Sequence, residues 1–180
     1  MKTTCSAAVG PLLLSGSMAG GASGGPVGRP NILFIITDQQ FAEVMSCRMG
    51  KEHVHTPAMD GLAQEGTLFT RAYSTNPLCM PARNSIFTGR YSHETGVTKN
   101  AHPEGGQLAP EFVCMGTYLK KAGYQTAYSG KWHLSLNEKD PSTHGFEILD
   151  RRTKLTPPEA DNYDARVSHA AVEFLKRKQT

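Results

Sequence analysis

The chain has 180 residues, of which 38% are hydrophobic and 19% are charged, and its formal net charge is +3. This composition is typical of one globular domain and excludes a largely disordered protein. The basic run at residues 176–178 fits a helix C-terminus, so nucleic acid is not an expected partner. The four cysteines lack Cys-x-x-Cys spacing, which argues against a zinc ribbon and a thioredoxin-type redox motif.

The first 28 residues differ in composition from the rest of the chain. A basic start, Met1-Lys2, precedes a short apolar run at residues 7–14 and a segment rich in Gly, Ser and Ala. This order is typical of a signal peptide, so we expect export to the periplasm or secretion; the alternative is a disordered, low-complexity N-terminus. The apolar run is too short for stable membrane insertion. We therefore expect a leader at 1–28 and an ordered region at 29–180.

Alternating strands and helices are predicted along the ordered region. The apolar, β-branched run at residues 31–37 is typical of a strand buried on both faces of a parallel sheet. Hydrophobic periodicity, Pro and Gly positions predict further strands and helices. The strands are expected at 67–73 and 124–129, and the helices at 57–66, 81–89, 113–122 and 164–178, with a loop-rich segment at 137–158. The chain is therefore expected to have an α/β fold, with a mainly parallel sheet flanked by helices.

Asp38 and Gln39 directly follow the first expected strand. Ligands of such sheets bind beyond the carboxyl ends of the strands. A carboxylate and an amide oxygen at this position are suitable ligands for Ca²⁺ or Mg²⁺. The alternative is that Asp38 is an ordinary turn or capping residue.

Two further polar segments follow in the sequence. The first is Cys79-Met-Pro-Ala-Arg83, with Thr-Gly-Arg90 beyond it, where Pro81 is expected to begin a helix. Taken alone, Cys79 is either a thiol nucleophile or a small buried residue. The second segment is Gly-Lys131-Trp-His133, which follows an expected strand. Its Lys and His are two residues apart, so in an extended segment their side chains share one side.

Together these segments resemble the sulfatase family. The Cys-x-Pro-x-Arg run resembles its signature, and Gly-Lys-Trp-His resembles a second landmark of the family. The resemblance extends over about residues 29–178 and implies an alkaline-phosphatase-like α/β core. Two positions depart from the family pattern: Gln39 stands where a second Asp is common, and Ala82 where Ser is usual.

The resemblance implies a function for each candidate residue. A maturation enzyme would oxidise Cys79 to formylglycine, the nucleophile that cleaves sulfate esters. Asp38, Gln39 and residue 79 would bind a divalent metal, Ca²⁺ or alternatively Mg²⁺. Arg83 would hold the formylglycine diol, Lys131 would offset charge on the sulfuryl oxygens, and His133 would orient the diol or the sulfate. The expected substrates are sulfated carbohydrates or aryl sulfates.

Two alternatives stay open: a phosphonate or phosphate ester hydrolase of the same superfamily, and a catalytically inactive remnant. The family's second metal-ligand pair, Asp followed by Asn or His, lies in the later half of its members. Asp161-Asn162 matches that pair in composition only. We therefore expect residues 29–180 to be the N-terminal part of a sulfatase catalytic domain, a truncated core that is inactive alone.

Overall fold

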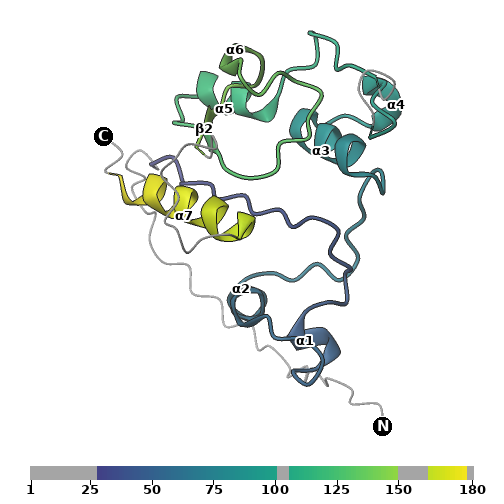
Figure 1. The fold of residues 1–180 in the computed structure, drawn as a ribbon, viewed down its shortest axis with the longest axis vertical. Helices are drawn as coiled ribbons and strands as arrows, with labels where there is room; N and C mark the ends of the chain where they lie inside the picture. The colour runs from purple at the N-terminus through teal and green to yellow at the C-terminus, as the bar shows by residue number, and fades with distance from the viewer. Residues whose placement is uncertain (1–27, 101–105, 150–161, 178–180) are drawn as a thin grey trace, which may run out of the picture. The chain divides into compact units, whose positions relative to one another are not determined.

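The computed structural model describes residues 28–100, 106–149 and 162–177 (Figure 1). The chain divides into two compact units, residues 1–36 and 37–180. The expected leader lies almost wholly outside the described residues, so the boundary at 28/29 stays a prediction. None of the helices in the described part is both long enough and apolar enough to cross a bilayer.

The described part of the first unit, residues 28–36, is irregular in conformation. The prediction of a buried strand at 31–37 is therefore wrong for this structure. Apolar side chains along it stay exposed, with Leu33 at 65% and Ile35 at 68%. A strand buried on both faces needs neighbouring strands and covering helices, and the apolar run alone does not provide them.

The strand predicted at 67–73 is also not formed. Phe69 is 77% exposed and Tyr73 is 86% exposed. The β-branched and aromatic residues of this segment favour extended backbone, but strand propensity depends on the neighbours that cover the side chains. Within the described residues, no second strand pairs with this segment.

The helix predictions are confirmed to within about two residues at each end. Within the described residues, four helices match predictions and three further helices of one turn each were not predicted. In chain order the helices of the described part are α1 Ser46–Met49, α2 Pro57–Glu65, α3 Cys79–Thr88, α4 Ser92–Thr95, α5 Met115–Lys121, α6 Pro141–His144 and α7 Tyr163–Lys176. Proline at the first position of α2 and glycine after α2 and α3 agree with the stop and start signals used in the prediction.

A small parallel sheet confirms the predicted strand direction. β1 (Ala127–Tyr128) pairs with β2 (Glu147–Ile148), with Ala127 opposite Glu147 and Tyr128 opposite Ile148. The strand predicted at 124–129 is thus shorter than expected, and the segment predicted as loop contains α6 and β2. The chain between the strands passes through the Gly-Lys-Trp-His segment, so the sheet places that segment at the carboxyl end of β1.

Helix α3 is held by two apolar clusters, one at each end. Met80 near its start belongs to a cluster with Val97 and Leu108. Phe87 near its end belongs to the other. That cluster contains Phe87, Cys114, Trp132, Leu134 and Phe146. Because α3 also contacts α4 and α5, the helix that carries Cys79 is fixed along its length (Figure 1).

Candidate active site

Cys79 is the first residue of α3. The prediction that Pro81 begins the helix is wrong by two residues: the N–H of Ala82 already donates to the carbonyl of Leu78, at 2.9 Å. Proline is tolerated here because the first-turn N–H groups have no partner within the helix. Cys79 is half-buried, and helix geometry fixes its position.

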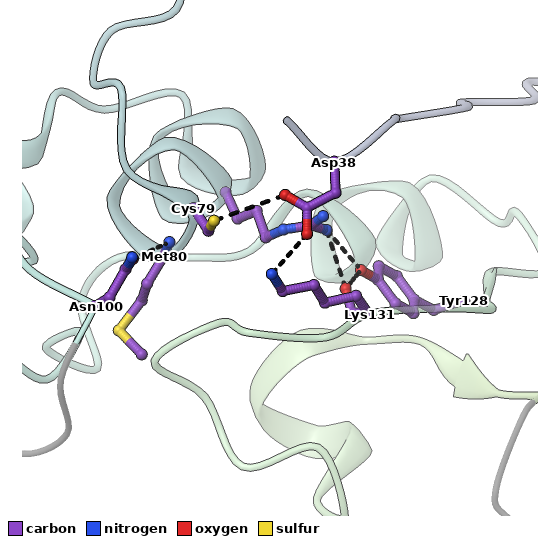
Figure 2. A network of polar contacts seen from close by, with 7 residues as sticks. Asp38, Cys79, Met80, Asn100, Tyr128 and Lys131 are labelled. Carbon is purple, nitrogen blue, oxygen red and sulfur yellow. Dashed lines mark hydrogen bonds and ion pairs between the residues drawn. The ribbon is translucent and has the colours of Figure 1, made fainter. Parts of the chain in front are cut away.

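A distant asparagine completes the start of this helix. Leu78, at the N-cap position, has no side-chain oxygen that could accept a first-turn N–H. Instead the N–H of Met80 donates to Asn100 Oδ1 at 2.9 Å, as Figure 2 shows. The residue next to the candidate nucleophile is thereby tied to the loop that follows α4.

A second asparagine ties α3 to the segment after Gly-Lys-Trp-His. Asn84 is 1% exposed. Its Nδ2 donates to the carbonyl of Met80 at 2.8 Å, and its Oδ1 accepts from the N–H of Ser135 at 3.3 Å. Both functional groups of this buried amide are thus paired, which holds the two motif segments in one arrangement.

Asp38 brings the three predicted segments together. Its Oδ2 accepts from Lys131 Nζ at 2.6 Å, and its Oδ1 lies 3.6 Å from Cys79 Sγ (Figure 2). Cys79 and Lys131 lie 41 and 93 residues after Asp38 in the sequence, respectively. The three candidate segments therefore meet at the Asp38 carboxylate, while the chemical roles assigned to their residues stay predictions.

The electrostatics of the cluster follow from this ion pair. The hydrogen bond from Lys131 lowers the pKa of Asp38 from its ordinary value, assisted by the charges of Lys131 and Arg83 and opposed by slight burial. The same hydrogen bond raises the pKa of Lys131. The Asp38 and Lys131 side chains are 46% and 38% exposed, so solvent screens their attraction. At neutral pH both groups are charged.

Arg83 is buried and binds the main chain of the Gly-Lys-Trp-His segment. It is 5% exposed, and its Nη1 donates to the carbonyl of Lys131 at 2.9 Å. The same nitrogen lies 3.4 Å from the hydroxyl of Tyr128, which itself donates to the Lys131 carbonyl at 2.5 Å. Burial raises the pKa of Tyr128, so its hydroxyl stays a donor at neutral pH. The observed partners of Arg83 therefore place it beneath Lys131, and its predicted contact with the residue 79 side chain stays a prediction.

Gln39 and His133 both have positive φ, at 36° and 44°. Residues other than Gly rarely adopt this conformation, and where it occurs it is often at functional sites. The premise that Lys131 and His133 lie in an extended segment is wrong, because left-handed backbone at His133 breaks the alternation of sides. His133 Nδ1 is buried and has no hydrogen-bond partner among the described residues.

The described residues supply only part of a cation site. In the ranges 28–100, 106–149 and 162–177, no group of three or more His, Cys, Asp or Glu residues is placed to hold a metal. Asp38 brings one carboxylate, whose Oδ2 is already paired with Lys131. Ca²⁺ takes six to eight oxygen ligands, and Mg²⁺ takes six. Asp38, Gln39 and residue 79 therefore do not complete a site for either ion.

Sequence reasoning missed three residues whose contacts position the site: Asn84, Asn100 and Tyr128. Each bonds to main-chain groups of one of the two motif segments. Of the three, only Tyr128 left a signal, since it lies three residues before Lys131, at the end of an expected strand.

Comparison with known proteins settles the family. A family model described as Sulfatase matches residues 30–180. This chain belongs to the sulfatase family. It is 43% identical over 106 residues to the uncharacterized sulfatase YidJ of Escherichia coli, a match that covers 59% of this chain and 20% of the relative. It is 45% identical over 108 residues to an N-acetylglucosamine-6-O-sulfatase of Bacteroides thetaiotaomicron, covering 59% and 18%.

A human relative extends the match further along the chain. The N-acetylgalactosamine-6-sulfatase of Homo sapiens is 40% identical over 143 residues, covering 71% of this chain and 26% of that protein. The solved structure of a 2-O GAG sulfatase aligns with a TM-score of 0.56 at 24% identity, over 76% of this chain and 29% of that one. The latter likeness supports the fold, an α/β core of the alkaline-phosphatase-like kind. The sulfatase chain described here spans about a fifth to a quarter of the length of these curated relatives.

Proposed function

We propose that residues 29–180 are the N-terminal part of the catalytic domain of a sulfuric ester hydrolase. One observation carries the proposal: Cys79, Asp38 and Lys131, from three separate segments, meet at one carboxylate. The expected substrates are sulfated carbohydrates or aryl sulfates. Two relatives are named for sulfated N-acetylhexosamines, which favours the carbohydrate class.

The nucleophile is proposed to arise from Cys79. A formylglycine-generating enzyme would be the maturation partner of the chain. Formylglycine at this position supplies, as its hydrate, the hydroxyl that displaces an alcohol from sulfur, and covalent catalysis divides the displacement into two easier steps. Because the start of α3 is fixed by Asn100 and the two apolar clusters, residue 79 is presented in one orientation.

The other residues act on charge and orientation. The Lys131 ammonium group is half-exposed and carries donors for the sulfuryl oxygens of a substrate, where it offsets developing negative charge. His133 has a buried Nδ1 that finds no hydrogen-bond partner in the described part of the chain, which supports a role in orienting the nucleophile or the sulfate by hydrogen bonding. Arg83 adds a second positive charge near Asp38.

A divalent cation is proposed as the cofactor, Ca²⁺ in the first place and Mg²⁺ as the alternative. Asp38, Gln39 and residue 79 would be the ligands that this part of the protein contributes. Since they supply too few oxygens, the whole site requires further ligands. The composition of residues 1–28 supports export to the periplasm or secretion, as argued above.

The first experiment follows the maturation of Cys79. The 180-residue chain is expressed with and without a formylglycine-generating enzyme, and its cysteine peptides are analysed by mass spectrometry. We expect loss of the sulfur atom at Cys79 and none at Cys47, the matched internal control, which is an exposed free thiol. An unmodified Cys79 in the presence of the enzyme would contradict the proposed nucleophile.

The second experiment identifies the ester. The matured chain, and the protein encoded by any longer reading frame of the same gene, are assayed with 4-nitrophenyl sulfate, 4-nitrophenyl phosphate and a phenylphosphonate ester. Turnover of the sulfate that disappears in Cys79→Ala supports the sulfatase. Faster turnover of either phosphorus ester supports the alternative hydrolase. Complete conversion of Cys79 without turnover in either protein supports the inactive remnant.

A further inference from the structure

We propose that Tyr128 is a positioning residue of this site: its hydroxyl fixes the main chain at Lys131 so that the ammonium group reaches Asp38. The hydrogen-bond partners of the Tyr128 hydroxyl are Lys131 and Arg83, so Tyr128 acts on Asp38 through Lys131. The importance of this for catalysis rests on the proposed function, but the positioning itself does not.

The ring of Tyr128 is anchored on several sides. Its centroid lies 5.0 Å from that of Trp132, 5.8 Å from that of Phe87 and 5.9 Å from that of Phe146. Trp132, Phe87 and Phe146 are themselves buried members of the larger apolar cluster. The Trp132 pair is edge-to-face and the other two are tilted, and aromatic pairs at these separations add favourable contacts to the burial of area. The ring therefore has little freedom, and the position of its hydroxyl is determined by the core.

The hydroxyl then determines the position of the next segment. It donates to the carbonyl of Lys131 at 2.5 Å, and Arg83 Nη1 donates to the same oxygen at 2.9 Å. A carbonyl oxygen has two lone pairs, so the two donors satisfy it completely. Figure 2 shows Tyr128, Lys131 and Asp38 in this one network. One contact comes from β1 and the other from α3, so the Lys131 main chain is held between the sheet and the nucleophile helix.

The ion pair alone is too weak to hold Lys131. Exposed salt bridges contribute little, because solvent screens the charges and a long side chain loses rotamer freedom on pairing. Both partners here are more than a third exposed. A fixed backbone at Lys131 reduces the number of positions that its ammonium group can reach. The ammonium group is therefore paired with Asp38 for a larger fraction of the time. Removing the hydroxyl of Tyr128 changes how firmly the Lys131 backbone is held and leaves the charges of Asp38 and Lys131 unchanged.

A zero-length crosslink measures the pairing directly. A water-soluble carbodiimide activates the Asp38 carboxylate, the Lys131 amine attacks it, an amide bond forms, and the carbodiimide leaves as its urea. The product is quantified by mass spectrometry of the full 180-residue chain. The pair Glu173–Lys176, whose charged atoms are 3.0 Å apart, is the internal reference for reagent and for folding of the sample. The compared proteins are the wild type, Tyr128→Phe, and Tyr118→Phe as the matched control on an exposed tyrosine.

We expect the Asp38–Lys131 yield, divided by the reference yield, to fall at least about threefold in Tyr128→Phe and to stay unchanged in Tyr118→Phe, because only the first removes a donor to Lys131. Phe87→Leu loosens the packing around the ring but keeps the hydroxyl, so its ratio should stay near that of the wild type. An unchanged ratio in Tyr128→Phe, or an equal fall in Phe87→Leu, would overturn the proposal.

Folding is checked by circular dichroism. If Tyr128→Phe does not fold, Tyr128→Met replaces it, since Met lacks the hydroxyl and adapts to irregular apolar space. Failure of both to fold would also overturn the proposal, because Tyr128 would then be a residue of the core. Absence of the crosslink in the wild type would overturn this proposal together with the Asp38–Lys131 pairing on which the proposed function draws, whereas an unchanged ratio in Tyr128→Phe would overturn this proposal alone, so the two failures are distinguishable.

Discussion

Replacing Asn84 with Ala tests whether the buried amide joins the two motif segments. The change removes the hydrogen bonds to the Met80 carbonyl and from the Ser135 N–H, at 2.8 and 3.3 Å. Each is worth about 1 kcal/mol net, and leaving the Ser135 N–H unpaired where it is buried costs roughly 1 kcal/mol more. With the small cavity left by the amide, the free energy of unfolding should fall by about 2–4 kcal/mol.

Urea unfolding of the full chain measures this loss by linear extrapolation. Trp132 is the only tryptophan of the chain and is 8% exposed, so its fluorescence reports on the core beside the site. Gln107→Ala is the matched control, since it removes an exposed amide and should change stability by less than about 0.5 kcal/mol. A loss in Asn84→Ala no larger than that of the control would refute the reasoning.

Asn84→Asp sharpens the same test. An ionised carboxylate can accept from Ser135 but cannot donate to the Met80 carbonyl, so the folded state favours the protonated acid and raises its pKa. The stability of this variant should therefore be highest below the ordinary Asp pKa of about 3.9 and be lost as pH rises through the folded-state value. A stability difference from wild type that does not vary between about pH 4 and pH 7 would contradict a buried, doubly bonded side chain.

Three further changes probe the elements that support the site. His144 is fully buried, and burial lowers its pKa, so the fold holds it neutral while the unfolded chain takes up a proton. The free energy of unfolding should therefore fall as pH drops below about 6.5, by up to roughly 1.4 kcal/mol at pH 5.5. A His144→Asn variant, measured by urea unfolding at both pH values, should lack this share of the loss. Asn100→Ala removes the acceptor for the Met80 N–H and should lower the free energy of unfolding by about 1 kcal/mol. Asn100→Asp keeps an acceptor and adds a favourable negative charge at the start of α3. Equal Tm values for the two variants would argue against capping by residue 100. Gly116→Ala should destabilise by about 1–3 kcal/mol in the same unfolding assay, although Ala favours helices, because its Cβ would overlap the His144 carbonyl and the Phe146 ring; a gain in stability would contradict that close approach.

Helices were predictable here because their signals are local. Pro57 and Gly66 mark the ends of α2, and the apolar period of α7 is readable from one segment alone. Two of the three predicted strands did not form, because residues 31–37 and 67–73 carry the right residue types but need partners from other segments; the third is present in shortened form as β1. Local propensity indicates that a segment can be a strand, and pairing decides whether it becomes one.

The same distinction between local and long-range signals applies to the candidate site. Asp38, Cys79 and Lys131 were singled out because they follow expected strands or stand at an expected helix start, where ligands of such sheets bind. The strand expected before Asp38 is not formed, so this argument does not explain the contacts of Asp38. Among the contacts that hold these residues, Asn84 accepts from the Ser135 N–H, 51 residues away, and the Tyr128 hydroxyl donates to the Lys131 carbonyl, three residues away. Such bonds leave no periodic trace in the sequence, and left-handed backbone at His133 likewise has no residue-type signal.

Under the proposed function, the protein groups of the site, before any cation is bound, would suit an anionic ester group. Within the described residues, the carboxylate of Asp38 faces Lys131 and lies near Arg83, so one negative charge is set against two positive ones. Arg83 is buried and donates a hydrogen bond to the Lys131 carbonyl, so its side chain is not free to move toward a ligand. Its positive charge therefore acts on the site from a fixed position. The Lys131 side chain is partly exposed, so its ammonium group can turn toward a ligand while its main chain stays held. Under the proposed function, an entering sulfate ester would share the Lys131 ammonium group with Asp38 while the hydrogen bonds of the buried Arg83 stay in place, so electrostatic stabilisation would require little rearrangement.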